Sequence, residues 1–414
     1  MLKLLSFILL LAFPNGLAAK HPTHAVIVSA ASSSDEICGS NLSMDIEAAR
    51  VYHSLINGGV PAENIIVFML GVIMNKSGCN PWPGHLYKDG NKGIDYFPTL
   101  KVDYQAESMT TENFLAVLRG DENGVKGGSG RVLKTNKEDR IFIFHDGHGD
   151  VGLLKFADSE DLTKEMLNKT LDVMIKNEKF KELVYFVSTC HSGSMFEGIL
   201  PKNGPIYAIT STTPSEGEPF VNCKIIKDVD IDPTKQTLKE QYQFIKNNSK
   251  ENHPTEYGNP VSNFEGSAQY LSAALNVPVN EDESSVPKCS IGRYESLKQK
   301  VKKFGFDEKL NAKLTEMEQE RGQIQKMIKQ VVSSIIGRSK QFVDAFVKEQ
   351  PKTIMNLNCH HRVIKLIEKE CQKINKSPFV NEFVGPMINL CESEYKTEHI
   401  LSSIRKECTN FKLN

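Results

Sequence analysis

Two stretches decide the fold: RIFIFHDGHGD at residues 140–150 and LVYFVSTCHSGS at residues 183–194. Each begins with a run of β-branched and aromatic residues, which is typical of a strand buried on both faces. Each run then passes into a glycine-containing turn, with His148 in the first turn and Cys190 in the second. We therefore predict two neighbouring strands that bring a histidine and a thiol to one edge of a sheet.

Other short apolar runs extend this pattern along the N-terminal two thirds of the chain. Helical patterns at Met44–Asn57 and Glu112–Arg119 lie between these runs. Strands that alternate with helices indicate an α/β fold with a mostly parallel sheet flanked by helices. The predicted strands are residues 24–30, 64–70, 140–144, 183–188 and 205–210.

The first nineteen residues have the pattern of a cleaved signal peptide. A basic Lys3 precedes the apolar run Leu4–Phe13, and small residues follow at Ala18 and Ala19. The apolar run is shorter than the roughly 18 residues that a transmembrane helix needs, and no later stretch reaches that length. We expect a chain that enters the secretory pathway, begins near Lys20 once mature and has no membrane span.

Length, charge and cysteine count narrow the possibilities further. The chain has 414 residues, more than one hydrophobic core usually holds, so we expect two domains. A formal net charge of -1 gives no electrostatic basis for nucleic-acid binding. Nine cysteines in an oxidising compartment indicate disulfides and, because the number is odd, at least one leftover thiol.

The amino-acid composition of the chain changes after about Ala274. An acidic patch at residues 281–283 and a lysine-rich segment at residues 298–303 indicate an exposed linker, which we place at residues 286–309. From Leu310 onward apolar residues recur at spacings of three, four or seven residues, as on one face of a helix. We predict an all-helical domain over residues 310–414.

Four cysteines lie in that helical domain: Cys359, Cys371, Cys391 and Cys408. Two disulfides would stabilise so small a domain. A zinc site is the alternative, since His360 and His361 adjoin Cys359, but there is no Cys-x-x-Cys pair and the spacings are wide. We favour disulfides and expect no metal and no cofactor.

The pair of His148 and Cys190 has the composition that thiol hydrolysis requires. A thiolate is the nucleophile, and an imidazole within reach takes its proton and returns it to the leaving amine. Gly149 would let a substrate carbonyl approach, and its N–H, with that of Cys190, would form an oxyanion hole. The alternatives are a buried structural cysteine with a loop histidine, or His145 as the base, but His145 lies within the strand.

These residues resemble the legumain family of asparaginyl endopeptidases. The resemblance rests on His-Gly at 148–149, Cys-x-Ser-Gly-Ser-Met at 190–195 and NFLAVLRGD at 113–121. It covers nearly the whole mature chain, because Gly59-Val-Pro61, Tyr257-Gly258 and the four tail cysteines also agree. The chain is thus similar to a divergent legumain.

The resemblance implies several further features. It implies a caspase-like catalytic domain at residues 20–285 and a helical prodomain that inhibits the zymogen and leaves on acidification and cleavage. It implies that Asn41 supports the catalytic histidine, that Cys359 pairs with Cys391 and that Cys371 pairs with Cys408. Protein or peptide substrates, and a lysosomal, vacuolar or extracellular location, follow in the same way.

The substrate pocket departs from the family pattern. Legumains select asparagine with an Arg-His pair after the supporting Asn and a Glu two residues before the nucleophile; here those positions hold Ser43, Met44 and Ser188. Losing charged groups from a polar pocket relaxes or replaces specificity. Two positions beside the reacting groups also differ, with Gly147 before His148 and His191 after Cys190.

The sequence leaves three functions open. The first is an active cysteine endopeptidase, or a ligase by reverse acyl transfer, whose specificity departs from asparagine. The second is a catalytically inactive homologue that acts as a binding or regulatory protein. The third, a subunit like that of GPI transamidase, does not explain the four-cysteine tail.

Asn-x-Ser/Thr sequons fit a secreted glycoprotein. We expect glycans at Asn75, Asn168 and Asn247, whereas the sequon at Asn41 coincides with the candidate site. Cys38, Cys79, Cys223 and Cys289 stay unassigned.

Overall fold

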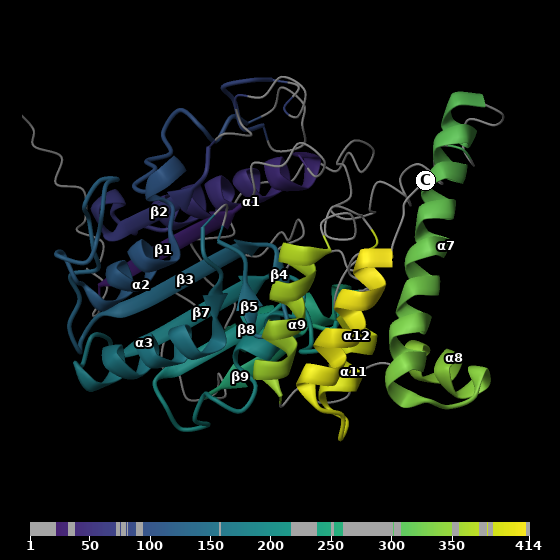
Figure 1. Ribbon diagram of the computed structural model, residues 1–414. Coiled ribbons are helices and arrows are strands. Elements are labelled where there is room, and N and C mark those ends of the chain that lie inside the picture. The colour runs from purple at the N-terminus through teal and green to yellow at the C-terminus, as the bar shows by residue number, and fades with distance from the viewer. Residues whose placement is uncertain are drawn as a thin grey trace, which may run out of the picture.

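The computed structural model describes residues 22–31, 38–71, 75, 80, 82–87, 94–156, 159–216, 238–249, 252–259, 301, 308–349, 356–371, 379 and 384–410 (Figure 1). The predicted signal peptide at residues 1–19, Cys79, Cys223, Cys289, the side chain of Cys38 and most of the predicted linker lie outside this description. The domain boundaries therefore stay predictions.

Six strands form one sheet in the order β2-β1-β3-β7-β8-β9. The first five strands run parallel and β9 pairs antiparallel with β8, so the predicted, mostly parallel sheet is confirmed. β3 continues past the predicted end at Phe144, because His145, Asp146 and Gly147 stay in register with β1. The strands are β1 Thr23–Ala30, β2 Ile65–Met69, β3 Arg140–Gly147, β7 Glu182–Ser188, β8 Ile206–Thr210 and β9 Thr255–Gly258.

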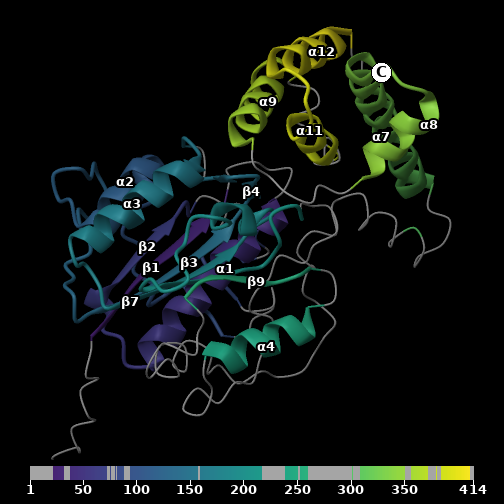
Figure 2. The same cartoon turned by 90° about the horizontal axis from the view of Figure 1, so that it is seen from below.

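Helices cover both faces of this sheet (Figure 2). α1 and α4 pack on one face, and α2 and α3 on the other. α1 begins six residues before the predicted Met44, because the segment ahead of Met44 is polar and carries no apolar periodicity. The helices are α1 Cys38–Asn57, α2 Thr111–Arg119, α3 Lys164–Lys176 and α4 Leu238–Asn248.

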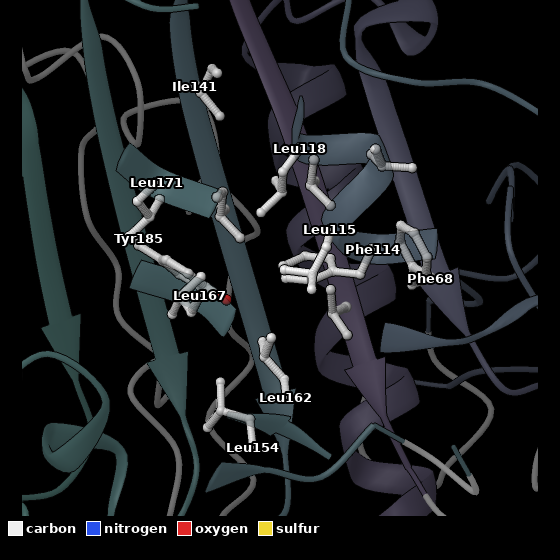
Figure 3. Close-up of a cluster of buried hydrophobic side chains, with 14 of the residues drawn as sticks. Phe68, Phe114, Leu115, Leu118, Ile141, Leu154, Leu162, Leu167, Leu171 and Tyr185 are labelled. Carbon is white, nitrogen blue, oxygen red and sulfur yellow. The ribbon is translucent and has the colours of Figure 1, made fainter. Parts of the chain in front are cut away.

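Alternate residues of each strand fill the two cores. Figure 3 shows the core under α2 and α3, where Phe68 and Phe114 meet edge to face with ring centroids 5.8 Å apart. His145 enters this core fully buried, beside Phe114 and Phe156, so it is a packed residue of β3. Burial lowers the pKa of His145 to about 3, which keeps the imidazole neutral.

The C-terminal part is helical, as predicted, and has a core of its own. Its described helices are α7 Glu308–Ile336, α8 Lys340–Lys348, α9 Leu357–Glu370, α11 Val384–Cys391 and α12 Thr397–Asn410. The structure contains the disulfides Cys359–Cys391 and Cys371–Cys408, which join α9 to α11 and the end of α9 to α12. These cysteines are therefore not zinc ligands.

A small antiparallel sheet follows β3 at the carboxyl edge of the main sheet. It consists of β4 Gly149–Asp150, β5 Leu153–Leu154 and β6 Leu162–Thr163. α9 and α11 lie above β4 in Figure 2. The helical part thus docks where the main sheet ends.

Candidate active site

β3 and β7 are neighbours, and this adjacency brings His148 and Cys190 to one edge. Their last registered pair is Asp146 with Ser188, and the histidine and the cysteine each follow two residues later. A Cβ added to Gly149 would press against the carbonyl oxygen of Cys190 and lie 2.6 Å from the Oγ1 atom of Thr189. Only glycine lets the two turns approach so closely.

Asn41 supports His148 in the way that the resemblance implies. Asn41 lies in the first turns of α1, is fully buried, and its Oδ1 atom is 3.1 Å from Nε2 of His148. A neutral His148 that donates from Nε2 carries its lone pair on Nδ1. Nδ1 is then the nitrogen that can accept a proton from a nucleophile, and the buried Asn41 cannot carry a glycan.

The surroundings of His148 keep it a neutral base. Burial lowers the pKa of His148 to about 4, and the nearby ammonium of Lys155 acts in the same direction. An imidazole with this pKa is unprotonated from mildly acidic to neutral pH. Cys190 is buried and carries a thiol, whereas the described cysteines of the tail form disulfides.

Hydroxyl groups anchor the turn that carries Cys190. Ser211 and Thr212, just after β8, donate hydrogen bonds of 3.1 and 3.0 Å to the carbonyl of Thr189. The N–H of Ser192 donates to Thr212 Oγ1 at 2.9 Å. This turn is also strained, because His191 has φ +53, a left-handed value that non-glycine residues rarely adopt.

Ser194 ties the cysteine turn to the histidine turn. Its Oγ atom accepts from the N–H of Gly152 at 2.7 Å and donates to the carbonyl of His191 at 2.6 Å. One hydroxyl thus fixes the segment after Gly149 relative to the segment after Cys190. Such fixed positioning is what an oxyanion site needs.

The three residues predicted to line the pocket lie beneath this edge, on the face that α1 covers. Met44 and Ser188 are buried, and Ser43 is half-buried. Two acidic residues join them: Asp146 on β3, and Asp45, whose Oδ1 atom accepts from Ser29 Oγ at 2.6 Å. Burial raises the pKa of Asp45 to about 7. None of the three predicted positions holds an arginine, histidine or glutamate side chain.

The helical part covers the edge beside His148. Val151 and Leu153 pack with Ile364 and Ile388 in an apolar cluster, against which Leu357 also packs. Nε2 of His360 lies 3.3 Å from Asp150 Oδ1, and Nε2 of His361 lies 3.2 Å from the carbonyl oxygen of Val151. In this state the helical part lies against the residues that follow His148 and Gly149.

The sequence interpretation missed Ser194, Thr212, Asp150 and His360 as parts of the site. Asp150 and His360 are 210 positions apart, and no local signal connects them. Ser194 belongs to the motif Cys-x-Ser-Gly-Ser-Met at 190–195, and its neighbour Gly193 packs against Pro214 and Tyr257. For Thr212 the sequence does hold a signal, because the predicted strand at 205–210 is followed directly by the hydroxyl residues Ser211 and Thr212.

Among the described residues, no group of three or more His, Cys, Asp or Glu side chains could hold a metal ion. No described helix is long and apolar enough to cross a membrane. Asn75 and Asn247 are exposed and Asn168 is half-buried, so glycans at these sequons stay predictions.

Family models match two parts of the chain. The model described as "Peptidase C13 family" matches residues 27–272, and the model described as "Legumain, prodomain" matches residues 312–408. Among curated proteins, legumain of Rattus norvegicus is 29% identical over 390 residues, which are 87% of this chain and 88% of that protein. Hemoglobinase of Schistosoma japonicum is 28% identical over 386 residues, with 87% and 88% covered.

Two further similarities cover less of the chain. The vacuolar-processing enzyme delta-isozyme of Arabidopsis thaliana is 35% identical over 222 residues, which are 48% of this chain and 47% of that protein. A crystal structure of caspase-1 from Spodoptera frugiperda shares 12% identity over 58% of this chain and 87% of that chain, with a TM-score of 0.33.

Proposed function

The chain belongs to the peptidase C13 family of cysteine endopeptidases, and we propose that it is an active thiol endopeptidase made as a zymogen, with Cys190 as nucleophile. The resemblance to legumains is confirmed by the matches to both family models. The observation that carries the proposal is the bond from His148 to Asn41, with Gly149 pressed against the turn of Cys190.

The proposed reaction is acyl transfer. Nδ1 of His148 takes the thiol proton as Sγ of Cys190 attacks the scissile carbonyl carbon. The N–H groups of Gly149 and Cys190 would hold the oxyanion, and His148 then protonates the amine as the peptide bond breaks. Water, deprotonated by His148, attacks the thioester, releases the acid and restores the thiol. An amine in place of water gives ligation.

The pocket supports a specificity other than asparagine. Ser43, Met44 and Ser188 offer no charged group to a substrate amide. Burial raises the pKa of Asp45 to about 7, so this carboxyl is largely protonated below pH 7. A site that has lost its hydrogen-bonding partners discriminates less by several kcal/mol. We propose that asparagine is not strongly preferred at the cleaved bond.

The helical part is proposed as the inhibitor of the zymogen, since it packs on Val151 and Leu153 beside His148. Cutting within the predicted linker, residues 286–309, would release it. A secretory route to a lysosome, a vacuole or the exterior is proposed from the predicted signal peptide and from the plant relative's name.

The test is covalent capture of the nucleophile. The full chain, cut in its linker, is treated with peptidyl acyloxymethyl ketones that differ in the residue beside the warhead, and labelling is measured by mass spectrometry. We expect labelling at Cys190 that is lost in Cys190→Ala and strongly slowed in His148→Ala. Equal labelling rates in the wild-type chain and in His148→Ala, or no labelling of Cys190, would favour the alternative of an inactive binding protein.

A further inference from the structure

The turn of Cys190 lies against the segment 211–216 that follows β8. His191, next to the proposed nucleophile, contacts this segment twice: its N–H donates to the carbonyl of Glu216 at 2.7 Å, and its Nδ1 atom lies 3.0 Å from the carbonyl oxygen of Pro214. A carbonyl only accepts, so Nδ1 carries the hydrogen of the second bond. Both contacts involve the residue whose left-handed φ strains the turn.

The side chain of Glu216 fixes the place of its own carbonyl. Its Oε2 atom accepts from the N–H of Thr213 at 2.8 Å and from the N–H of His253 at 3.3 Å. Its Oε1 atom accepts from Nδ1 of His253. One carboxylate therefore closes the turn at residues 213–216 and ties it to the residues ahead of β9.

The other end of the segment is anchored from the same stretch of chain. Nδ2 of Asn252, a buried side chain, donates to the carbonyl of Ser211 at 2.8 Å. Asn252 and His253 are adjacent, so the stretch just ahead of β9 holds the segment 211–216 at its first and at its last residue. We call Glu216, Asn252 and His253 the outer clamp.

The bonds of the outer clamp are not equally strong. The side chain of His253 is 78% exposed, and an exposed ion pair contributes little to stability. The side chain of Glu216 is only 21% exposed and also accepts from two backbone N–H groups. Burial alone would raise the pKa of Glu216, but the hydrogen bonds from His253 and Thr213 outweigh burial and lower it, so the group stays a carboxylate in mild acid.

We propose that Glu216 is a positioning residue for Cys190: through the outer clamp it holds the carbonyl that receives the His191 N–H, and this fixes the strained turn that carries the nucleophile. The inference rests on the proposed function. A strained residue keeps its conformation only where surrounding contacts hold it. If the side chain of Glu216 is removed, His191 relaxes and both Sγ and the N–H of Cys190 move relative to His148.

The first test measures hydrogen exchange of the His191 amide in the intact full chain, by mass spectrometry with fragmentation that resolves single residues. Glu216→Ala should speed this exchange by about tenfold, because the acceptor of the N–H is no longer held. Glu216→Gln keeps one oxygen that can accept from the N–H groups of Thr213 and His253, so it should restore most of the protection.

Two further variants separate the outer clamp from its surroundings. Glu256→Ala is the matched control, because Glu256 lies on β9 and accepts from the hydroxyl of Tyr207 at 3.0 Å. It should leave exchange of the His191 amide unchanged. His253→Ala removes the exposed ring and keeps the backbone N–H, so it should speed exchange by less than Glu216→Ala does.

The second test measures turnover after the linker is cut. Glu216→Ala should lower kcat by about tenfold and leave KM within about twofold, because it moves the nucleophile and leaves the predicted pocket intact. Glu216→Gln should recover most of kcat.

Unchanged exchange of the His191 amide in Glu216→Ala would overturn the inference, and so would faster exchange with unchanged kcat. Faster exchange together with a wild-type chain that shows no Cys190-dependent cleavage would instead overturn the proposed function. The outer clamp would then stand as the support of this turn.

Discussion

The reacting edge and the predicted pocket beneath it both take residues from one turn of α1, Asn41–Asp45, yet the contacts that hold them differ. At the edge, Asn41 holds His148, and Gly149 fits against the Cys190 turn with no room for a side chain. Beneath it, Asp45 keeps a fully buried Oδ2 atom that has no hydrogen-bond partner among the described residues. The groups at the edge are thus fixed by close contacts, whereas the predicted pocket keeps a buried carboxyl oxygen without a partner among the described residues.

The largest expected effect comes from filling the contact at Gly149. Gly149→Ala would push Cβ into the carbonyl of Cys190 and displace an oxyanion donor, so we expect kcat/KM to fall by about 10²–10³. Steady-state kinetics of the cut chain measures this. As a control, Gly322→Ala in α7 should leave kcat/KM unchanged, since nothing lies within 4 Å of its added Cβ. Equal rate losses in both variants would contradict the distinction.

Removing the support of His148 should have the next largest effect. Asn41→Ala frees the imidazole to rotate, and misplacing a catalytic group by about 1 Å costs up to about 10²-fold in rate. We expect a drop in kcat with little change in KM. Asn113→Ala is the matched control, because Asn113 is an equally buried asparagine whose bonds to Ser108 and Lys126 lie away from the site. It should cost stability and leave kcat unchanged.

The buried carboxyl of Asp45 should make the free energy of unfolding depend on pH. The folded pKa of Asp45 is raised to about 7, so between its ordinary value near 4 and pH 7 the folded chain binds more protons than the unfolded chain. Asp45 therefore lowers the free energy of unfolding as pH rises through this window. Asp45→Asn should stabilise the protein by about 2 kcal/mol at pH 7 and have little effect at pH 4. Chemical denaturation at both pH values tests this, and an equal effect at both would contradict it.

The smallest effect concerns release of the helical part by acid. Burial lowers the pKa of His361 in the docked chain, so below about pH 6.5 the docked form binds fewer protons than the released form, and the hold weakens as pH falls. Asp150 stays ionised down to about pH 2 and does not contribute to this release. Gel filtration of the cut chain should show that the helical part binds the rest of the chain several-fold more weakly at pH 5 than at pH 7. His361→Gln should flatten this difference, whereas His360→Gln should weaken the hold at both pH values.

The sequence predicted the candidate site best where reactive residues directly follow a strand. Apolar runs that end in His148-Gly149 and Cys190 predicted adjacent parallel strands, because such runs leave the sheet at its carboxyl edge. Contacts between distant segments could not be found this way. The contact of His360 with Asp150 depends on how two separately folded cores meet, and the bond of Asp45 to Ser29 depends on how α1 packs against β1. The pocket's acidic side chains were missed for that reason.

The most direct test of the central claim is a comparison of the peptide bonds cut in a mixed peptide library by the cut wild-type chain and by Cys190→Ala. New termini would be identified by mass spectrometry. If Cys190 is the nucleophile and the pocket does not select asparagine, the new termini depend on Cys190 and follow residues other than asparagine as well. Identical patterns from the two proteins would contradict the reaction, and Cys190-dependent termini found only after asparagine would contradict the changed pocket.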